Sequence, residues 1–232
     1  GVFSIPRDTL VKVEGHGLTK LNHAYAYGGE TLMRQTVSNF LNIPIQHFVK
    51  VNIDGVRRFI DDVGGVQINV GQDLFYEDRA GGVYIDLKKG DQLLSGDQVV
   101  QYLRFRQGVN GDIGRVGRQQ SLLFSMVGQV FNAKNAVDIP FLISKVLANV
   151  QTDLSFKQLI GLSGQFRSVL ESRRIKSGTV PGVTILKEGV SYYRPDITKM
   201  DKLLGAILFG FDESESKIVS KVDTEDKVAS QQ

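Results

Sequence analysis

The chain alternates short apolar runs typical of β-strands with longer segments of helical periodicity. Strand-like runs lie at 2–5, 47–53, 66–70 and 179–186, and helical patterns lie at 30–41, 54–62, 114–132, 138–150, 155–170 and 197–211. Strands that alternate with helices bury their apolar faces by packing the helices on a sheet. The pattern therefore predicts an α/β fold, a three-layer α-β-α sandwich with a mixed central sheet and helices on both faces.

Local signals mark the expected element boundaries. Asp54 is expected to cap the helix over 54–62, and Ser95 to begin a helix that leads toward residue 102. Residues 71–92 are expected to form an exposed hairpin excursion, and 15–25 a loop opened by glycine. Two apolar helix faces are predicted to point inward, Leu32, Met33, Val37, Phe40 and Leu41 on the first helix and Val116, Leu123, Val127, Val130 and Phe131 on a later one.

Length and composition are those of one large globular domain. The sequence has 232 residues, of which 41% are hydrophobic, and it contains no cysteine. The sequence therefore forms no disulfide, thiolate metal site or cysteine nucleophile, and no apolar run reaches the ~20 residues of a membrane span. We expect one folded domain over 1–211 and a polar, disordered tail over 212–232. The tail carries six acidic residues and three lysines, so its charge is −3 and the remainder of the +3 chain carries +6.

An arginine-rich segment at 102–120 is the strongest functional signal. Arg104 and Arg106 point the same way if their part is extended, and Arg115, Arg118 and Gln119 share one face if theirs is helical. Intervening glycines would let the chain reverse between the two parts. Guanidinium groups pair bidentately with phosphate oxygens, and a helix N-terminus adds partial positive charge. The segment predicts a phosphate or pyrophosphate site, and a solvated basic helix is the alternative.

A second candidate site follows the first predicted strand. A proline ends that strand, so Arg7 and Asp8 fall on the loop past its carboxyl end, where α/β proteins bind ligands. Asp8 has an equally good role as a brace of the turn. Asn22 and His23, in the predicted loop at 15–25, are possible site residues, and a structural role for His23 remains open.

Several chemistries are excluded by the motifs that the sequence lacks. It contains neither a Gly-x-x-x-x-Gly-Lys-Ser/Thr phosphate loop nor a Gly-x-Ser-x-Gly elbow, and its three histidines lie at no metal-ligand spacing. Nucleic-acid binders spread their basic residues along a face, often with aromatic residues for stacking. In this chain the arginines are concentrated at two places, which favours a small and highly charged head group.

Five segments together carry a family resemblance. They read SIPRDT at 4–9, LNHAYAYGG at 21–29, DVGGV at 62–66, YLRFR at 102–106 and GDIGRVGRQQ at 111–120. In order and spacing they resemble the successive motifs of the LytR-CpsA-Psr family, with motifs over about residues 1–135 and a looser likeness beyond. The resemblance implies a bacterial phosphotransferase that attaches an anionic glycopolymer, such as wall teichoic acid or capsule, to peptidoglycan. The donor is an undecaprenyl-pyrophosphate carrier, whose tail would lie in an apolar tunnel.

Residue roles follow from the resemblance by matching position. The residues implied to hold the pyrophosphate are Arg7, Arg104, Arg106, Arg115, Arg118 and Gln119, and those implied to be catalytic are Arg7, Asp8 and Arg106. The family also implies Mg²⁺, held by aspartates of a motif that would precede residue 1. The first motif, an early strand and the membrane-anchoring helix of an extracellular enzyme are accordingly expected upstream of this chain.

Two other functions remain open. The first is a non-enzymatic binder of polyprenyl pyrophosphate or of polyanionic polymers, which the same arginine cluster would serve. The second is a transcriptional regulator, which the historical label of the family suggests; it is the least favoured because no nucleic-acid-binding module is legible.

Overall fold

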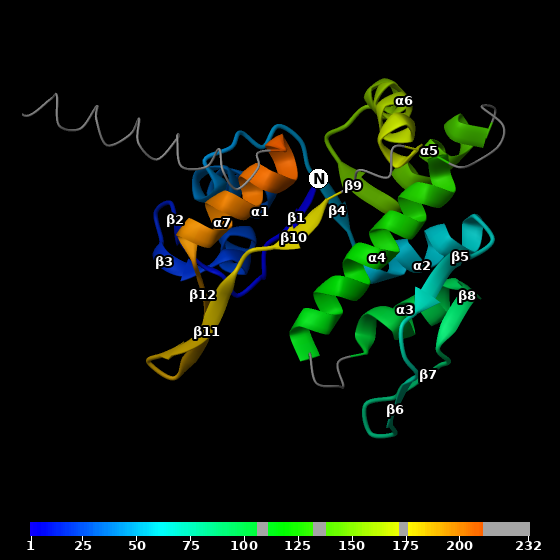
Figure 1. Cartoon of the computed structure of the whole chain (residues 1–232), viewed down its shortest axis with the longest axis horizontal. Helices are drawn as coiled ribbons and strands as arrows, with labels where there is room; N and C mark the ends of the chain where they lie inside the picture. The colour runs from blue at the N-terminus through cyan, green and yellow to red at the C-terminus, as the bar shows by residue number, and fades with distance from the viewer. Residues whose placement is uncertain (106–110, 132–137, 172–175, 211–232) are drawn as a thin grey trace, which may run out of the picture. The chain divides into compact units, whose positions relative to one another are not determined.

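The computed structural model describes residues 1–105, 111–131, 138–171 and 176–210, which form two compact units (Figure 1). Unit 1 comprises Gly1–Gln46 and Ile175–Gln232, and unit 2 comprises His47–Arg174. Among the described residues, no helix combines the length and the apolar character needed to cross a membrane. The predicted tail at 212–232 lies outside the described residues.

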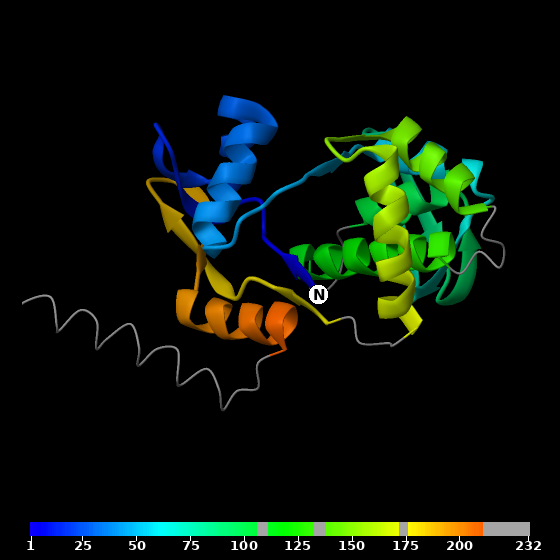
Figure 2. The same cartoon turned by 90° about the horizontal axis from the view of Figure 1, so that it is seen from above.

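Unit 1 places helices on opposite sides of its strands, as Figure 2 shows. In chain order its elements are β1 (Val2–Ser4), β2 (Leu10–Val13), β3 (Gly17–Lys20), α1 (Leu21–Leu41), β10 (Ser177–Thr179), β11 (Gly182–Lys187), β12 (Val190–Pro195), α7 (Ile197–Leu204) and the π-helical turn η1 (Gly205–Phe209). Strand β1 pairs with β10 in parallel, whereas β2 with β3 and β11 with β12 form antiparallel pairs.

Helix α1 begins earlier than its periodicity predicts. The predicted loop at 15–25 is wrong, because 17–20 pair with β2 and the helix starts at Leu21. Gly28 and Gly29, which directly precede the helix predicted at 30–41, instead lie within α1 and kink it: both have non-helical backbone angles, and Gly29 has φ 59° and ψ −149°. The predicted inward face is confirmed for four residues that pack against the buried cluster around Val11 and Leu21, namely Leu32, Met33, Val37 and Phe40.

Unit 2 is built from antiparallel strand pairs and five helices within its described part. In chain order its elements are β4 (Val49–Val51), α2 (Ile53–Asp62), β5 (Val66–Val70), β6 (Leu74–Asp78), β7 (Val83–Leu87), β8 (Gly90–Leu94), α3 (Gly96–Arg104), α4 (Gly111–Phe131), α5 (Asp138–Asn149), β9 (Val150–Thr152) and α6 (Phe156–Glu171). The pairs are β4 with β9, β5 with β8 and β6 with β7. Asn52, not Asp54, caps α2, since its Oδ1 accepts the Gly55 N–H at 2.6 Å.

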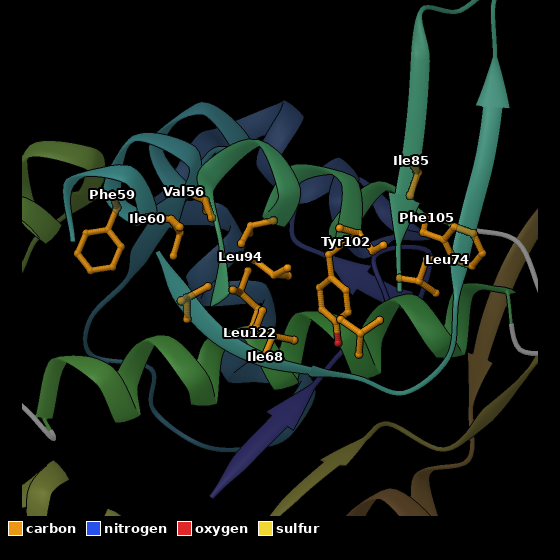
Figure 3. Packing of buried hydrophobic residues seen from close by; sticks show 14 residues of the cluster. Val56, Phe59, Ile60, Ile68, Leu74, Ile85, Leu94, Tyr102, Phe105 and Leu122 are labelled. Atoms are coloured by element: carbon orange, nitrogen blue, oxygen red, sulfur yellow. The ribbon is translucent and has the colours of Figure 1, made fainter. Parts of the chain in front are cut away.

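The core of unit 2 lies between its strands and the helices α2, α3 and α4 (Figure 3). Ile60, Ile85 and Leu94 are almost wholly buried there, and each such side chain contributes about 1.5–3 kcal/mol. From α4, Leu122 is buried in this core and Met126 packs against it, whereas the predicted inward Leu123 is 46% exposed. Neighbouring helix positions differ by about 100° in direction, so an error of one residue turns a side chain to the solvent. The side chains of Val127, Val130 and Phe131, also predicted to point inward, lie outside the described residues.

The α/β class is confirmed, and parallel and antiparallel pairing both occur. The predicted single central sheet is divided, within the described residues, into six two-stranded sheets. Short connections explain part of this difference. Strands β6 and β7 are joined by only four residues that include Gly81 and Gly82, and so short a connection favours an antiparallel hairpin over a strand paired across a helix.

Candidate functional site

The predicted site residues divide between the two units. Unit 1 carries Arg7, Asp8, Asn22 and His23, and unit 2 carries Arg104, Arg115, Arg118 and Gln119. Arg106 lies outside the described residues, as does the side chain of Arg115. The convergence of the two groups in one pocket therefore stays a prediction.

Hydrogen bonds within the loop at 6–9 of unit 1, and from the first turn of α1, fix its backbone. Thr9 is buried; its N–H donates to the Pro6 carbonyl at 3.0 Å, and its hydroxyl donates to the same oxygen at 2.5 Å. The first turn of α1 fixes the loop as well, because the N–H groups of Leu21 and Asn22 donate to the carbonyls of Thr9 and Arg7 at 2.8 and 3.0 Å. These bonds satisfy N–H groups that a helix start otherwise leaves open. The loop is thereby a fixed platform for two charged side chains.

Those side chains form a charged triad with a lysine that the sequence motifs did not reveal. Asp8 Oδ1 lies 3.1 Å from Lys20 Nζ, and Asp8 Oδ2 lies 3.5 Å from Arg7 Nε. Lys20 is the last residue of β3, and its ammonium group is 5.6 Å from the centroid of the Tyr192 ring on β12. Lys20 stands directly before the LNHAYAYGG motif, and this adjacency was the only sequence signal for it.

Asn22 and His23 lie on the first turn of α1, close in sequence to the triad. His23 Nδ1 is 2.7 Å from the Thr19 hydroxyl, and its ring meets Tyr27 edge-on at 5.9 Å. Asn22 Oδ1 is buried and has no hydrogen-bond partner among the described residues. Buried polar oxygens are usually satisfied. A donor from a bound molecule would satisfy this one, which keeps Asn22 a candidate.

Arg104 in unit 2 is exposed at the end of a helix and is not on a strand. Ser95 starts α3 with a capping box, in which its hydroxyl accepts the Gln98 N–H and the Gln98 side chain accepts the Ser95 N–H. The helix then runs to Arg104, and Phe105 ends it with extended backbone angles. The extended arrangement considered for Arg104 and Arg106 is therefore wrong for Arg104, since the strong cap carries helical structure to that residue.

Arg118 is held against the end of α3. Its Nη2 donates to the Phe105 carbonyl, and its Cζ lies 5.4 Å from the centroid of the Phe105 ring. Burial raises the pKa of the nearby Tyr102 hydroxyl, against the opposing effects of the Ser121 hydroxyl and the Arg118 charge. Gln119, one residue later on α4, is exposed. Arg118 thus joins α4 to α3 in addition to any contact with an anion.

No metal centre is formed by the part of the chain that the structure describes. In that part, His, Asp and Glu side chains do not gather in any group of three or more. Asp8 alone offers a carboxylate at the loop, and two cations already pair with it. These residues do not fit a Mg²⁺ site by themselves, and the expected aspartates upstream of residue 1 stay a prediction.

Comparison with known proteins gives matches along nearly the whole chain. The sequence model described as the LytR_cpsA_psr family matches residues 1–207. A polyisoprenyl-teichoic acid–peptidoglycan teichoic acid transferase, TagU of Enterococcus faecalis, is 34% identical over 204 residues; the match covers 87% of this chain and 65% of that protein. The chain thus spans slightly less than two thirds of this relative's length.

The fold of the chain is also similar to solved structures of proteins named as members of the Tag group. The crystal structure of Bacillus subtilis TagV matches with a TM-score of 0.77 at 32% identity, covering 88% of this chain and 80% of that one. A structure of TagT bound to LI-WTA matches with a TM-score of 0.71 at 27% identity, covering 88% of this chain and 78% of the other.

Proposed function

Because the chain belongs to the LytR-CpsA-Psr family, we propose that it transfers an anionic glycopolymer from a polyprenyl-pyrophosphate carrier to peptidoglycan. The names of the relatives make teichoic acid the first polymer to test. The observation that carries the proposal is the Arg7–Asp8–Lys20 triad on its rigid loop, within a sequence that matches the family over 1–207. Two cations around one carboxylate suit a ligand that brings phosphate charge.

The reaction is a phosphoryl transfer. A hydroxyl oxygen of peptidoglycan attacks the phosphorus attached to the polymer, and a new P–O bond forms. The bond from that phosphorus to the bridging oxygen of the pyrophosphate breaks, and polyprenyl phosphate leaves with the bonding electrons. The proton of the attacking hydroxyl passes to a base or to solvent. Positioning and neutralisation of phosphate charge supply most of the catalysis in such reactions.

The described residues have distinct parts in this proposal. The Arg7 and Lys20 cations bind and neutralise phosphate oxygens, and Asp8 orients both of them through its two oxygens. Arg104, which is exposed at the end of α3, is a further phosphate ligand. Arg106, Arg115 and Gln119 belong to the same proposed set by their positions in the family motifs. Arg118 has a mixed role because it also bonds to the Phe105 carbonyl.

We place the reaction at the extracellular face of the bacterial membrane, where peptidoglycan and its lipid-linked precursors meet. A membrane anchor and the aspartates for Mg²⁺ would precede residue 1 in this proposal. Mg²⁺ would supply further neutralisation of the pyrophosphate charge when bound. The proposed roles of Arg7, Asp8 and Lys20 do not depend on the metal.

The direct test is turnover with a defined donor. The purified chain is incubated with a short polyprenyl-pyrophosphate-linked disaccharide and un-cross-linked peptidoglycan, with and without Mg²⁺, and the products are identified by mass spectrometry. We expect peptidoglycan that carries the disaccharide through a phosphodiester, together with polyprenyl phosphate, and much less of both with Arg7→Ala. Saturable donor binding without product would favour the non-enzymatic binder. Sequence-selective binding to duplex DNA without turnover would favour the regulator.

A further inference from the structure

The β6–β7 hairpin of unit 2 presents two exposed aromatic rings beside each other. Phe75 is 60% exposed and Tyr84 is 57% exposed. Their centroids are 6.3 Å apart and their planes cross at 89°, so the two rings form an edge-to-face pair with an exposed apolar surface. The opposite face of the hairpin contributes to the core, where Leu74 and Ile85 lie near Phe105 at the edge of the buried cluster (Figure 3). Successive side chains of a strand point to opposite faces, so Phe75 and Tyr84 face the solvent because their neighbours Leu74 and Ile85 face the core.

The strand register adds a carboxylate opposite each ring. Phe75 faces Asp86 and Tyr84 faces Glu77 across the antiparallel pair, so rings and carboxylates alternate on the outward face. Each carboxylate is paired with an exposed cation: Glu77 lies 2.7 Å from Arg79, and Asp86 lies 3.0 Å from Lys88. Exposed ion pairs of this kind are weak. The carboxylate oxygens can therefore accept hydrogen bonds from a ligand's hydroxyl groups.

The charge of this region differs in sign from that of the chain. Residues 71–92 contain five acidic and three basic residues, a net charge of −2, whereas the whole chain carries +3. Arg79 and Lys88 balance Glu77 and Asp86, so the net negative charge comes from Asp73, Asp78 and Asp91 against Lys89. A region with this net charge repels an anionic polymer such as teichoic acid. It also repels a membrane leaflet rich in anionic lipids. The surface suits an uncharged ligand that has both apolar faces and hydroxyl groups.

We propose that Phe75, Tyr84, Glu77 and Asp86 form a binding surface for the uncharged glycan strand of the peptidoglycan acceptor. This inference rests on the proposed function, which requires such an acceptor. The C–H faces of N-acetylated sugars pack on the negative faces of aromatic rings. The sugar hydroxyl groups donate to Glu77 and Asp86. The chain would thus separate its two substrates by charge, with arginine and lysine for the anionic donor and an acidic aromatic surface for the acceptor.

The test measures binding, and turnover is not needed for it. The probe is isolated peptidoglycan sacculi stripped of teichoic acid by acid, and binding of the full chain is measured by co-sedimentation, with chitotetraose as a soluble competitor. The main variant is the double substitution Phe75→Ser with Tyr84→Ser. Tyr84→Phe keeps the ring, and Phe141→Ser removes a 55% exposed ring elsewhere in the same unit. Circular dichroism and thermal melting show whether each variant is folded.

We expect the double variant to bind sacculi at least tenfold more weakly, and Tyr84→Phe and Phe141→Ser to bind within twofold of the wild type. Chitotetraose should displace the wild type. A folded double variant that binds within twofold of the wild type would overturn the proposal. It would also be overturned if the double variant kept sacculus binding and lost binding to phosphatidylglycerol vesicles. Transfer of the lipid-linked disaccharide to un-cross-linked peptidoglycan is measured in parallel: its absence, with hairpin-dependent sacculus binding intact, would contradict the proposed function alone.

Discussion

Lys20 Nζ lies 3.1 Å from one oxygen of Asp8, and Arg7 Nε lies 3.5 Å from the other. Two cations and one carboxylate give the triad a charge of two minus one, or +1. Backbone hydrogen bonds to α1 fix the loop that carries Asp8. The Asp8 carboxylate therefore orients both cations before a ligand binds. Such preorganisation is what stabilises charge that develops on phosphate oxygens.

Lys20 is accordingly expected to matter as much as the arginines that the motifs reveal. We predict that Lys20→Met lowers kcat/KM for transfer about 10- to 100-fold, the range of one charged hydrogen bond. The matched control is Lys12→Met on β2, an exposed lysine of the same unit. The measurement is steady-state transfer from the lipid-linked disaccharide. Equal transfer activity of the two variants would show that Lys20 does not take part in the site.

Asp8 has two alternative roles: it orients the Arg7 and Lys20 cations, or it only stabilises the turn. We predict that Asp8→Asn lowers transfer, because the neutral amide no longer orients the Arg7 and Lys20 cations, while Arg7→Ala loses about 2–4 kcal/mol of transition-state stabilisation. Transfer rates are compared with melting temperatures for both variants. Full activity of Asp8→Asn would make the bracing of the turn its only role.

The sequence was sufficient for the α/β class, because alternating strand and helix patterns persist in both units. It also located the loop at 6–9, since proline lacks the N–H that a strand ladder uses and so often marks the end of a strand. The family motifs contain the charged residues proposed for the site in both units, and their roles stay predictions. These inferences depend on local chemistry, which a single sequence records directly.

Contacts between distant segments explain what the sequence did not reveal. Lys20 meets Asp8 only because β3 pairs with β2 and returns the chain to the loop. The helical start at Leu21 was missed because Gly28 and Gly29 indicated a helix that begins at residue 30, whereas in the structure they kink a longer helix. The link from Arg118 to the Phe105 carbonyl likewise requires two helices to pack, and spacing along one helix does not encode that.

Arg118 and Arg104 should therefore respond differently to removal. We predict that Arg118→Ala lowers the free energy of unfolding by about 1–3 kcal/mol, because the Phe105 carbonyl loses a charged donor. Arg104→Ala should change that free energy by less than ~0.5 kcal/mol, since the side chain is exposed, and should lower transfer. Urea unfolding and transfer assays measure both effects. Equal stability losses would contradict the structural part of the Arg118 assignment.

The kink of α1 should depend on one glycine. Gly29 has φ 59° with ψ −149°, a region that residues with a Cβ rarely adopt. We predict that Gly29→Ala lowers the free energy of unfolding by about 1–3 kcal/mol. In contrast, Gly161→Ala on α6, where an added Cβ meets no atom within 4 Å, should raise it by roughly 0.5–1 kcal/mol. If Gly29→Ala left the free energy of unfolding unchanged, the fold would not depend on the kink at this residue.

The N-terminus of α7 should make the stability of unit 1 depend on pH. Asp196 Oδ1 accepts the Lys199 N–H at 3.1 Å, and this bond is the main cause that lowers the pKa of Asp196, aided by the Lys199 ammonium group. Because the pKa is lower in the folded state, the stabilisation is present above the ordinary aspartate pKa of ~3.9 and is lost as the pH falls through the folded value. We predict that the melting temperature falls more steeply between pH 6 and pH 3 for the wild type than for Asp196→Asn. Asparagine keeps the cap but does not titrate. Parallel curves for the two proteins would show that this carboxylate contributes no pH dependence.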